Sequence, residues 1–179
     1  YNRPAVIGNM DQSVDMTTAC FDSCEDCVDY AALLHGSWSP IGMGVGPNQG
    51  DEGWWSYPRD GSRGCWEDDV FEFKADGTFT MDLGADTWLE GWQGVASEGC
   101  GAPVAPHVSA DHTYSFNASA MELTVNGDGA YVVLAKAHNS GEDGNSGGSI
   151  MYHVTSVTET EMILDLNYGN WWRLYLKKN

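Results

Sequence analysis

The clearest pattern in the chain is an alternation of apolar and polar side chains on both sides of a short polar break. Residues 70–74 (VFEFK) and 78–83 (TFTMDL) each alternate with a period of two, and residues 75–77 (ADG) separate them. This period is that of a strand with one buried face, and Asp-Gly supplies the positive φ that a tight turn requires. The pattern predicts a β-hairpin over residues 70–83.

Segments with the same strand-like character recur along the chain. They lie at residues 36–38, 112–117, 121–125, 130–134, 149–157, 161–167 and 170–176. Short runs of Gly, Asn, Asp and Ser separate most of them, as expected of turns between antiparallel strands. About eight to ten such strands must close on themselves or stack in two layers to hide their edges. We therefore predict an all-β domain over residues 36–179, either a lipocalin-like antiparallel barrel or a sandwich.

Three long segments between these strands do not alternate. Residues 39–64, 94–111 and 135–148 are rich in Gly, Pro or Asn, and they predict loops. Loops of this length carry function more often than they carry core packing.

The first 35 residues have a different character. Residues 1–19 show no sustained period and predict an extended N-terminal arm. Residues 20–35 are Cys-rich, and the order of acidic and then apolar residues from Asp22 to Leu34 predicts a short helix that ends at Gly36. Residue 1 is Tyr, as expected of a mature chain after removal of a signal peptide.

The chain is strongly acidic, with eight Lys and Arg residues, 26 Asp and Glu residues and a formal net charge of −18. Such a field repels the phosphates of nucleic acid and the anionic face of a membrane. The sequence also lacks a run of about 18 consecutive apolar residues that would span a bilayer. We expect no nucleic-acid partner and no membrane insertion, and a neutral polysaccharide suits this charge better than a polyanionic one.

The chain has five cysteines, Cys20, Cys24, Cys27, Cys65 and Cys100. In an acidic, Trp-rich chain they favour disulfides and an oxidising compartment, so we expect a protein that is secreted, extracellular or at the cell surface. The odd number leaves one thiol unpaired or shared between chains. The run at 20–27 offers three thiolates to zinc, but no fourth ligand stands at the usual spacing, so disulfides are favoured over zinc.

Tryptophans occur in pairs, namely Trp54 with Trp55, Trp88 with Trp92, and Trp171 with Trp172. Adjacent residues of a strand point to opposite faces, so each Trp-Trp doublet is expected to send one indole inward and one outward. An outward indole offers a flat apolar platform to the C–H face of a sugar ring. The pairs therefore predict carbohydrate binding.

Polar side chains accompany the second pair in the segment 86–94 (DTWLEGWQG). Alternation along a strand would place Asp86, Trp88, Glu90 and Trp92 on one face, although a bulge at Gly91 would change the register. Carboxylates and the Gln93 amide beside two indoles suit sugar hydroxyls. The predicted ligand-binding residues are Trp54, Trp55, Asp86, Trp88, Glu90, Trp92, Gln93, Trp171 and Trp172.

Catalytic patterns are weaker than this binding pattern. Glycosidases use two carboxyl groups about 5 to 10 Å apart, and contiguous acidic runs such as residues 67–69 point neighbouring side chains apart. Residues 144–148 match G-x-S-x-G in a Gly- and Ser-rich tract that lacks the strand, turn and helix of a hydrolase nucleophile. We therefore predict a protein that is not an enzyme and that has no catalytic residues.

Calcium is the one candidate cofactor. Extracellular β-domains bind this ion through loop carboxylates and carbonyls, and several acidic residues sit in or beside Gly-rich loops. The candidate ligands are Asp51, Glu52, Asp68 and Asp128.

Several runs carry a resemblance to known proteins: residues 34–38 (LHGSW), 44–55 (GVGPNQGDEGWW), 87–107, 134–142 (LAKAHNSGE) and 171–173 (WWR). With these runs, residues 33–176 resemble small secreted β domains of marine Bacteroidetes, some of them associated with glucan-utilisation systems, and also a lipocalin-like barrel. The resemblance implies a bridge between Cys65 and Cys100, because both lie in the matching region. It leaves two of Cys20, Cys24 and Cys27 to form a second bridge.

The leading functional hypothesis is an extracellular, non-catalytic protein that binds a neutral polysaccharide, with a glucan favoured. One alternative is a self-assembling subunit, a homo-oligomer in which the arm completes a neighbour's sheet and the odd cysteine links chains. A second alternative is a lipocalin-type binder of a small apolar ligand, which requires a hollow barrel interior.

Overall fold

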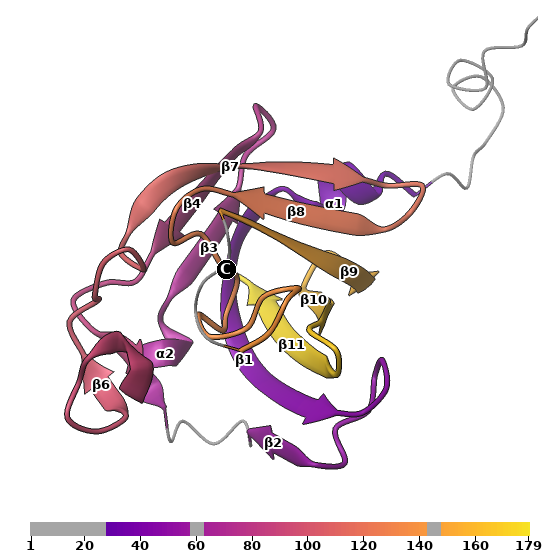
Figure 1. The fold of residues 1–179 in the computed structure, drawn as a ribbon. Coiled ribbons are helices and arrows are strands. Elements are labelled where there is room, and N and C mark those ends of the chain that lie inside the picture. Colours follow the sequence, from indigo (N-terminus) through magenta and orange to yellow (C-terminus); the bar gives the residue numbers. More distant parts are fainter. Residues whose placement is uncertain (1–27, 58–62, 143–147) are drawn as a thin grey trace, which may run out of the picture.

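The computed structural model describes residues 28–57, 63–142 and 148–179, and its main feature is a closed antiparallel barrel (Figure 1). Eight strands of this part of the chain form it: β1 (Gly36–Gly46), β3 (Val70–Phe73), β4 (Thr78–Asp82), β7 (Ala110–Asn117), β8 (Glu122–Asn126), β9 (Ser149–Val157), β10 (Glu161–Asn167) and β11 (Trp171–Lys178). Each strand pairs with the next in this series, and β11 pairs with β1, with Trp172 opposite Val45. The all-β prediction is confirmed, and the closure decides for a barrel over a sandwich.

The hairpin predicted over residues 70–83 is confirmed as β3 and β4. Phe73 and Phe79 face each other in the buried interior, with ring centroids 5.0 Å apart. Gly77 turns the chain with a φ of +88°, a conformation that strains any residue with a Cβ. The predicted strands at 112–117 and 121–125 and the terminal meander over 149–176 are confirmed in the same way.

The first strand is longer than predicted, because β1 continues through residues 39–46, which were expected to be loop. Its second half is covered on both sides, so the sequence does not alternate there. The loop of residues 47–54 lies so close to the strand that a Cβ on Gly46 would be 2.6 Å from the carbonyl oxygen of Asp51. Glycine at this position is what allows the loop to pack on the barrel.

The strand predicted at residues 130–134 is wrong. These residues form a buried plug inside the barrel, and each is at most 4% exposed. Val133 has a φ of +68°, and the N–H of Leu134 donates to the carbonyl of Val132 (2.8 Å), which defines a strained γ-turn. The N–H of Val132 donates to the Tyr152 hydroxyl of β9, which ties the plug to the barrel wall, and Trp66 Nε1 donates to the Val133 carbonyl from outside the barrel strands. A buried strand and a buried plug produce the same apolar run.

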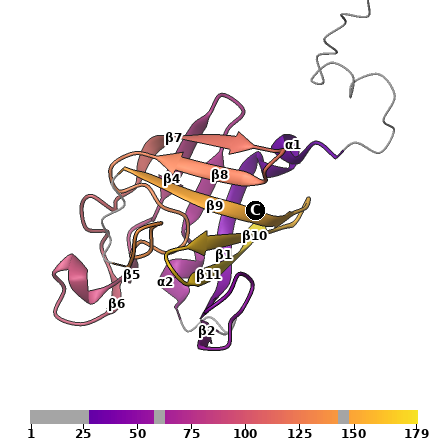
Figure 2. The same ribbon diagram turned by 45° about the vertical axis from the view of Figure 1, so that its right-hand side comes forward.

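Smaller elements gather at one end of the barrel, as both Figure 1 and Figure 2 show. They are β2 (Trp55–Tyr57), which pairs with the end of β1, the short helix α2 (Gly64–Glu67), and the hairpin of β5 (Thr87–Leu89) and β6 (Gly99–Gly101), with the 3₁₀ helix η1 (Gly91–Gln93) between its strands. The bridge between Cys65 and Cys100 is confirmed, with Cα atoms 6.0 Å apart, and it joins α2 to β6.

Helix α1 (Tyr30–Leu34) lies beyond the opposite end of the barrel, and the Asp29 carboxylate caps it by accepting from the N–H of Ala32 (2.9 Å). This is the described part of the helix predicted between Asp22 and Leu34. The predicted arm over residues 1–19 and Cys20, Cys24 and Cys27 lie outside the described residues. Within the described residues, no helix is long and apolar enough to cross a membrane.

Candidate functional site

A cavity of about 350 Å³ opens at the end of the barrel where β2, α2 and the β5–β6 hairpin gather. Its floor is apolar and buried, and it consists of Met43 and Val45 from β1, Leu134 from the plug and Trp172 from β11. Segments that lie far apart in the sequence supply aromatic and charged side chains to its rim. The volume lies in the range of roughly 300 to 1,000 Å³ that is common for small-molecule sites. We call this cavity the mouth pocket.

Two exposed tryptophans stand on one side of the mouth pocket. Trp54 is 57% exposed and Trp55 is 42% exposed, and the Trp55 ring meets Trp172 edge-on, with centroids 6.0 Å apart. The prediction that one member of this doublet points inward is therefore wrong. The reason is that β2 is a three-residue strand at the edge of the sheet, and neither of its faces covers the barrel interior.

The other doublet behaves as predicted. Trp172 points into the barrel and is 5% exposed, whereas Trp171 points outward against His153, with ring centroids 5.5 Å apart. Only Trp172 of this pair lines the mouth pocket.

The loop that presents Trp54 and Trp55 is anchored on the outer barrel wall. The Tyr175 hydroxyl donates to Glu52, and the N–H of Gly53 donates to Asp51 Oδ1 (2.8 Å). Gln49 hydrogen-bonds to Asp165, a fully buried carboxylate that also accepts two hydrogen bonds from Arg173 (2.8 and 2.9 Å). Burial alone would raise the pKa of Asp165, but these hydrogen bonds and the Arg173 charge hold it below its usual range.

Two basic side chains line the mouth pocket. The Cζ atom of Arg63 lies 3.9 Å from the ring centroid of Trp88 and 5.6 Å from that of Trp55. Burial lowers the pKa of Arg63. Lys136 lies 5.2 Å from the Trp172 ring. Within the described residues, neither side chain forms an ion pair.

Three carboxyl groups complete the polar side of the mouth pocket. Glu90 is 6% exposed and hydrogen-bonds to Glu98. Burial, together with the Glu98 charge and this hydrogen bond, raises the pKa of Glu90 against the opposing influence of Lys136 and Arg63. These influences favour the neutral form of Glu90, which can donate to Glu98. The third carboxylate, Glu142, accepts from the indole N–H of Trp172.

The predicted shared face of residues 86–92 is wrong. Strand β5 ends at Leu89, and η1 turns the chain away, so Trp92 packs edge-on against His107 (5.3 Å) outside the mouth pocket. Asp86 is exposed beside the disulfide, and Gln93 accepts from the backbone N–H of Glu90 (2.9 Å). Trp88 lies beneath Arg63, where it lines a small adjoining cavity and its buried N–H has no partner in the described part. The mouth pocket therefore unites four of the nine predicted residues, Trp54, Trp55, Glu90 and Trp172.

The predicted calcium ligands are not brought together. Asp51 and Glu52 anchor the β1–β2 loop, Asp68 is exposed at the end of α2, and Asp128 is exposed in the turn after β8. In the part of the chain that the structure describes, three ligand-type side chains converge in one place, Cys65, Asp86 and Cys100, and the two sulfurs there are bonded to each other.

Besides Met43, Val45 and Leu134 of the floor, sequence reasoning missed five side chains of the mouth pocket, Arg63, Glu98, Lys136, Glu142 and Tyr168. The first four lie in segments that do not alternate, and Tyr168 lies in the turn between β10 and β11, so no periodicity marks them. The available signal was the scarcity of basic residues, because Arg63 and Lys136 are two of only eight in the chain.

No protein-family model and no curated protein matches the chain. Among solved structures, the chain is similar to a lipocalin-like protein from Bacteroides uniformis, with a TM-score of 0.43 and 13% identity over 82% of this chain and 99% of that chain. It is also similar to an uncharacterized protein from Bacteroides eggerthii, with a TM-score of 0.43 and 10% identity over the same shares. No activity is carried over to this chain from likeness at this level.

Proposed function

We propose that the protein binds a neutral saccharide in the mouth pocket without cleaving it. The observation that carries the proposal is the position of two exposed tryptophans, Trp54 and Trp55, on the rim of a cavity lined by charged donors and acceptors. Sugar sites combine these two features, because an indole packs on the C–H face of a ring while charged groups bind its hydroxyls.

The charges of the mouth pocket favour a neutral ligand. Two basic side chains, Arg63 and Lys136, line the cavity together with three carboxyl groups, and the raised pKa of Glu90 brings the opposite charges closer to balance. A ligand with a net charge would meet a like charge on some wall of the cavity. A polyhydroxylated neutral ligand can use donors and acceptors alike.

Non-catalytic binding is supported by the geometry of the carboxyl pair. Glu90 and Glu98 hydrogen-bond to each other, so they are closer than the roughly 5 to 10 Å that separates the two carboxyl groups of glycosidases. The apolar-ligand alternative is not favoured, because large buried side chains such as Trp38, Phe71 and Tyr152 occupy the barrel interior. The Cys65–Cys100 bridge favours an oxidising, extracellular location.

Affinity electrophoresis on β-glucan gels tests the proposal. The wild-type protein should be retarded, and Trp54→Ala and Trp55→Ala should each weaken binding about tenfold or more, because an aromatic platform is lost. The matched control is Trp92→Ala, which removes a tryptophan of similar exposure, 41%, outside the mouth pocket. Loss of retardation in the Trp92 variant alone, or no retardation of the wild type on any neutral glycan, would overturn the proposal.

A further inference from the structure

One covalent bond joins two of the segments that supply charged side chains to the mouth pocket. Arg63 lies two residues before Cys65, at the start of α2, and Glu98 lies two residues before Cys100, at the start of β6. The disulfide thus connects the segment that carries Arg63 to the segment that carries Glu98.

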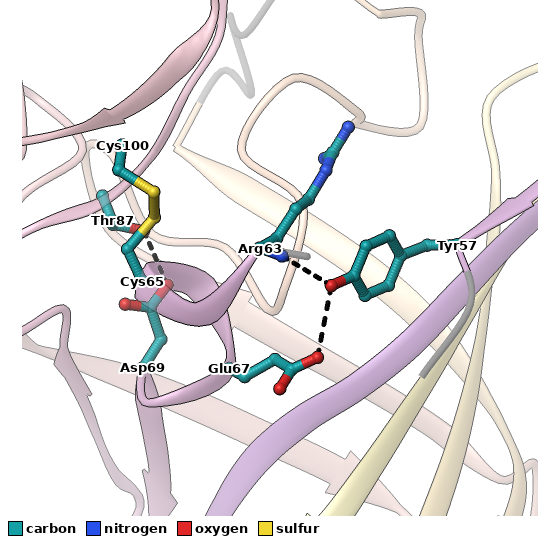
Figure 3. The surroundings of a disulfide bond; sticks show 7 residues. All are labelled: Tyr57, Arg63, Cys65, Glu67, Asp69, Thr87 and Cys100. Atoms are coloured by element: carbon teal, nitrogen blue, oxygen red, sulfur yellow. Dashed lines mark hydrogen bonds between the residues drawn. A yellow bond between two sulfur atoms is a disulfide. The ribbon is translucent and has the colours of Figure 1, made fainter. Parts of the chain in front are cut away.

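The β5–β6 hairpin is separate from the barrel sheet. Its two strands pair with each other, and in the described part neither pairs with a barrel strand. Thr87 Oγ1 donates to Asp69 Oδ2 (2.7 Å) directly beside the disulfide, as Figure 3 shows, and Arg63 lies on the Trp88 ring at 3.9 Å. Trp88 is the strand partner of Cys100, so the ring under Arg63 and the disulfide sit on the same rung of the hairpin. The hairpin also packs on the rest of the described protein through Trp88, through the buried side chains of Thr87 and Leu89, and through Trp92 on His107. The disulfide is its covalent tie to α2.

We propose that the Cys65–Cys100 disulfide is a redox-sensitive positioning element of the mouth pocket. In the oxidised protein it holds the Glu90–Glu98 pair against Arg63. Its reduction releases the hairpin and lowers saccharide affinity while the barrel stays folded. This inference rests on the proposed function, since it concerns the regulation of the same site.

The chemistry requires a dithiol as reductant. One thiolate of the reductant attacks a cysteine sulfur and breaks the S–S bond, which releases the other cysteine as a thiolate and forms a mixed disulfide. The second thiolate of the reductant then attacks the reductant's own sulfur in the mixed disulfide and releases the first cysteine. The dithiol becomes a disulfide, and Cys65 and Cys100 together gain two electrons and two protons. Cys100 is exposed, which gives the reductant access, and the pairing of β11 with β1 that closes the barrel involves neither cysteine.

The first arm of the test measures affinity. A chain with Cys20→Ser, Cys24→Ser and Cys27→Ser retains Cys65 and Cys100 as its only cysteines. Titration with a β-linked gluco-oligosaccharide should give about tenfold weaker binding after reduction with dithiothreitol, because a preorganised wall is lost. The control that adds Cys65→Ser and Cys100→Ser should bind like the reduced chain and should not respond to the dithiol. Equal affinity before and after reduction would overturn the inference.

The second arm measures amide hydrogen exchange in the same chain without ligand. Reduction should remove protection from the amides of residues 87–101 and leave those of β8, β9 and β10 unchanged. Unchanged protection at residues 87–101, or loss of protection throughout the barrel, would overturn the inference. If the oxidised chain binds no saccharide, the proposed function fails, and this arm still decides whether the disulfide positions the hairpin.

Discussion

Asp69 is a carboxyl group in surroundings that oppose its charge. It is fully buried, Oδ2 accepts from Thr87, and Oδ1 has no partner in the described part. Burial is the main cause that raises its pKa to about 8, the hydrogen bond from Thr87 opposes the shift, and the nearby carboxylates of Asp68, Asp82 and Asp86 add to it. Asp69 is therefore protonated at neutral pH in the folded protein.

This protonation makes stability depend on pH. In the unfolded chain an aspartate has a pKa of about 3.9. Between about pH 3.9 and about pH 8 the folded chain therefore binds more protons than the unfolded chain. The free energy of unfolding should therefore fall as pH rises through this window. Asp69→Asn removes the ionisable group, so the variant should be more stable than the wild type at pH 7, by a few kcal/mol at most.

Urea unfolding at several pH values between about 4 and 8 measures this effect. The difference in the free energy of unfolding between Asp69→Asn and the wild type should shrink toward the acidic end of the window. Asp111→Asn, an exposed site on β7, serves as the control and should keep the wild-type slope. Parallel slopes for the wild type and Asp69→Asn would refute this account of Asp69.

Glu90 gives ligand binding its own pH dependence. Burial and the neighbouring Glu98 raise its pKa, so Glu90 in the folded protein keeps its proton to a higher pH than an ordinary glutamate does. When pH rises through this pKa, the pair becomes two repelling carboxylates and loses a donor. Saccharide affinity, measured by calorimetry, should fall over that range in the wild type and stay level in Glu90→Gln. An affinity that rises with pH in the wild type would contradict this role.

At the scale of elements, the strands with one buried face were predictable. The 70–83 hairpin and the 149–176 meander alternate because one side of each strand meets the core and the other meets solvent. The second half of β1 and the plug at residues 130–134 are covered on both sides, so their sequences carry no period of two. The turn at η1 could not be predicted either, because a single 3₁₀ turn does not interrupt the alternation of polar and apolar residues in the sequence around it.

The β1–β2 loop is the element that presents the exposed tryptophans, and its close contact with β1 can be tested. A Cβ on Gly46 would be 2.6 Å from the Asp51 carbonyl oxygen, so Gly46→Ala must displace the loop. The variant should bind saccharide several-fold more weakly, as measured by calorimetry, because Trp54 and Trp55 move with the loop.

Gly91→Ala is the matched control, because a Cβ there meets open space and the backbone does not require glycine. It should bind like the wild type. Wild-type affinity in Gly46→Ala would show that the position of the loop does not matter for binding.

At the scale of the whole molecule, the charge at the mouth pocket differs from the strongly acidic net charge of the chain. The chain carries a net charge of −18, yet the mouth pocket contains two of its eight basic side chains, Arg63 and Lys136, beside three carboxyl groups. Sequence reasoning identified the tryptophans and Glu90 because the tryptophans occur in pairs and Glu90 lies between two of them in the sequence. It missed the basic and acidic partners because barrel closure brings together loops that lie far apart in the sequence, such as those carrying Arg63, Lys136 and Tyr168.

The central claim is that the mouth pocket is the saccharide site, and the indole N–H resonances of the tryptophans test it most directly. With assignments from single Trp→Phe variants, titration of the protein with a neutral gluco-oligosaccharide should shift the signals of Trp54, Trp55 and Trp172. The signals of Trp92 and Trp171, which lie outside the mouth pocket, should stay in place. Shifts confined to Trp92 or Trp171, or no shift with any neutral oligosaccharide, would contradict the claim.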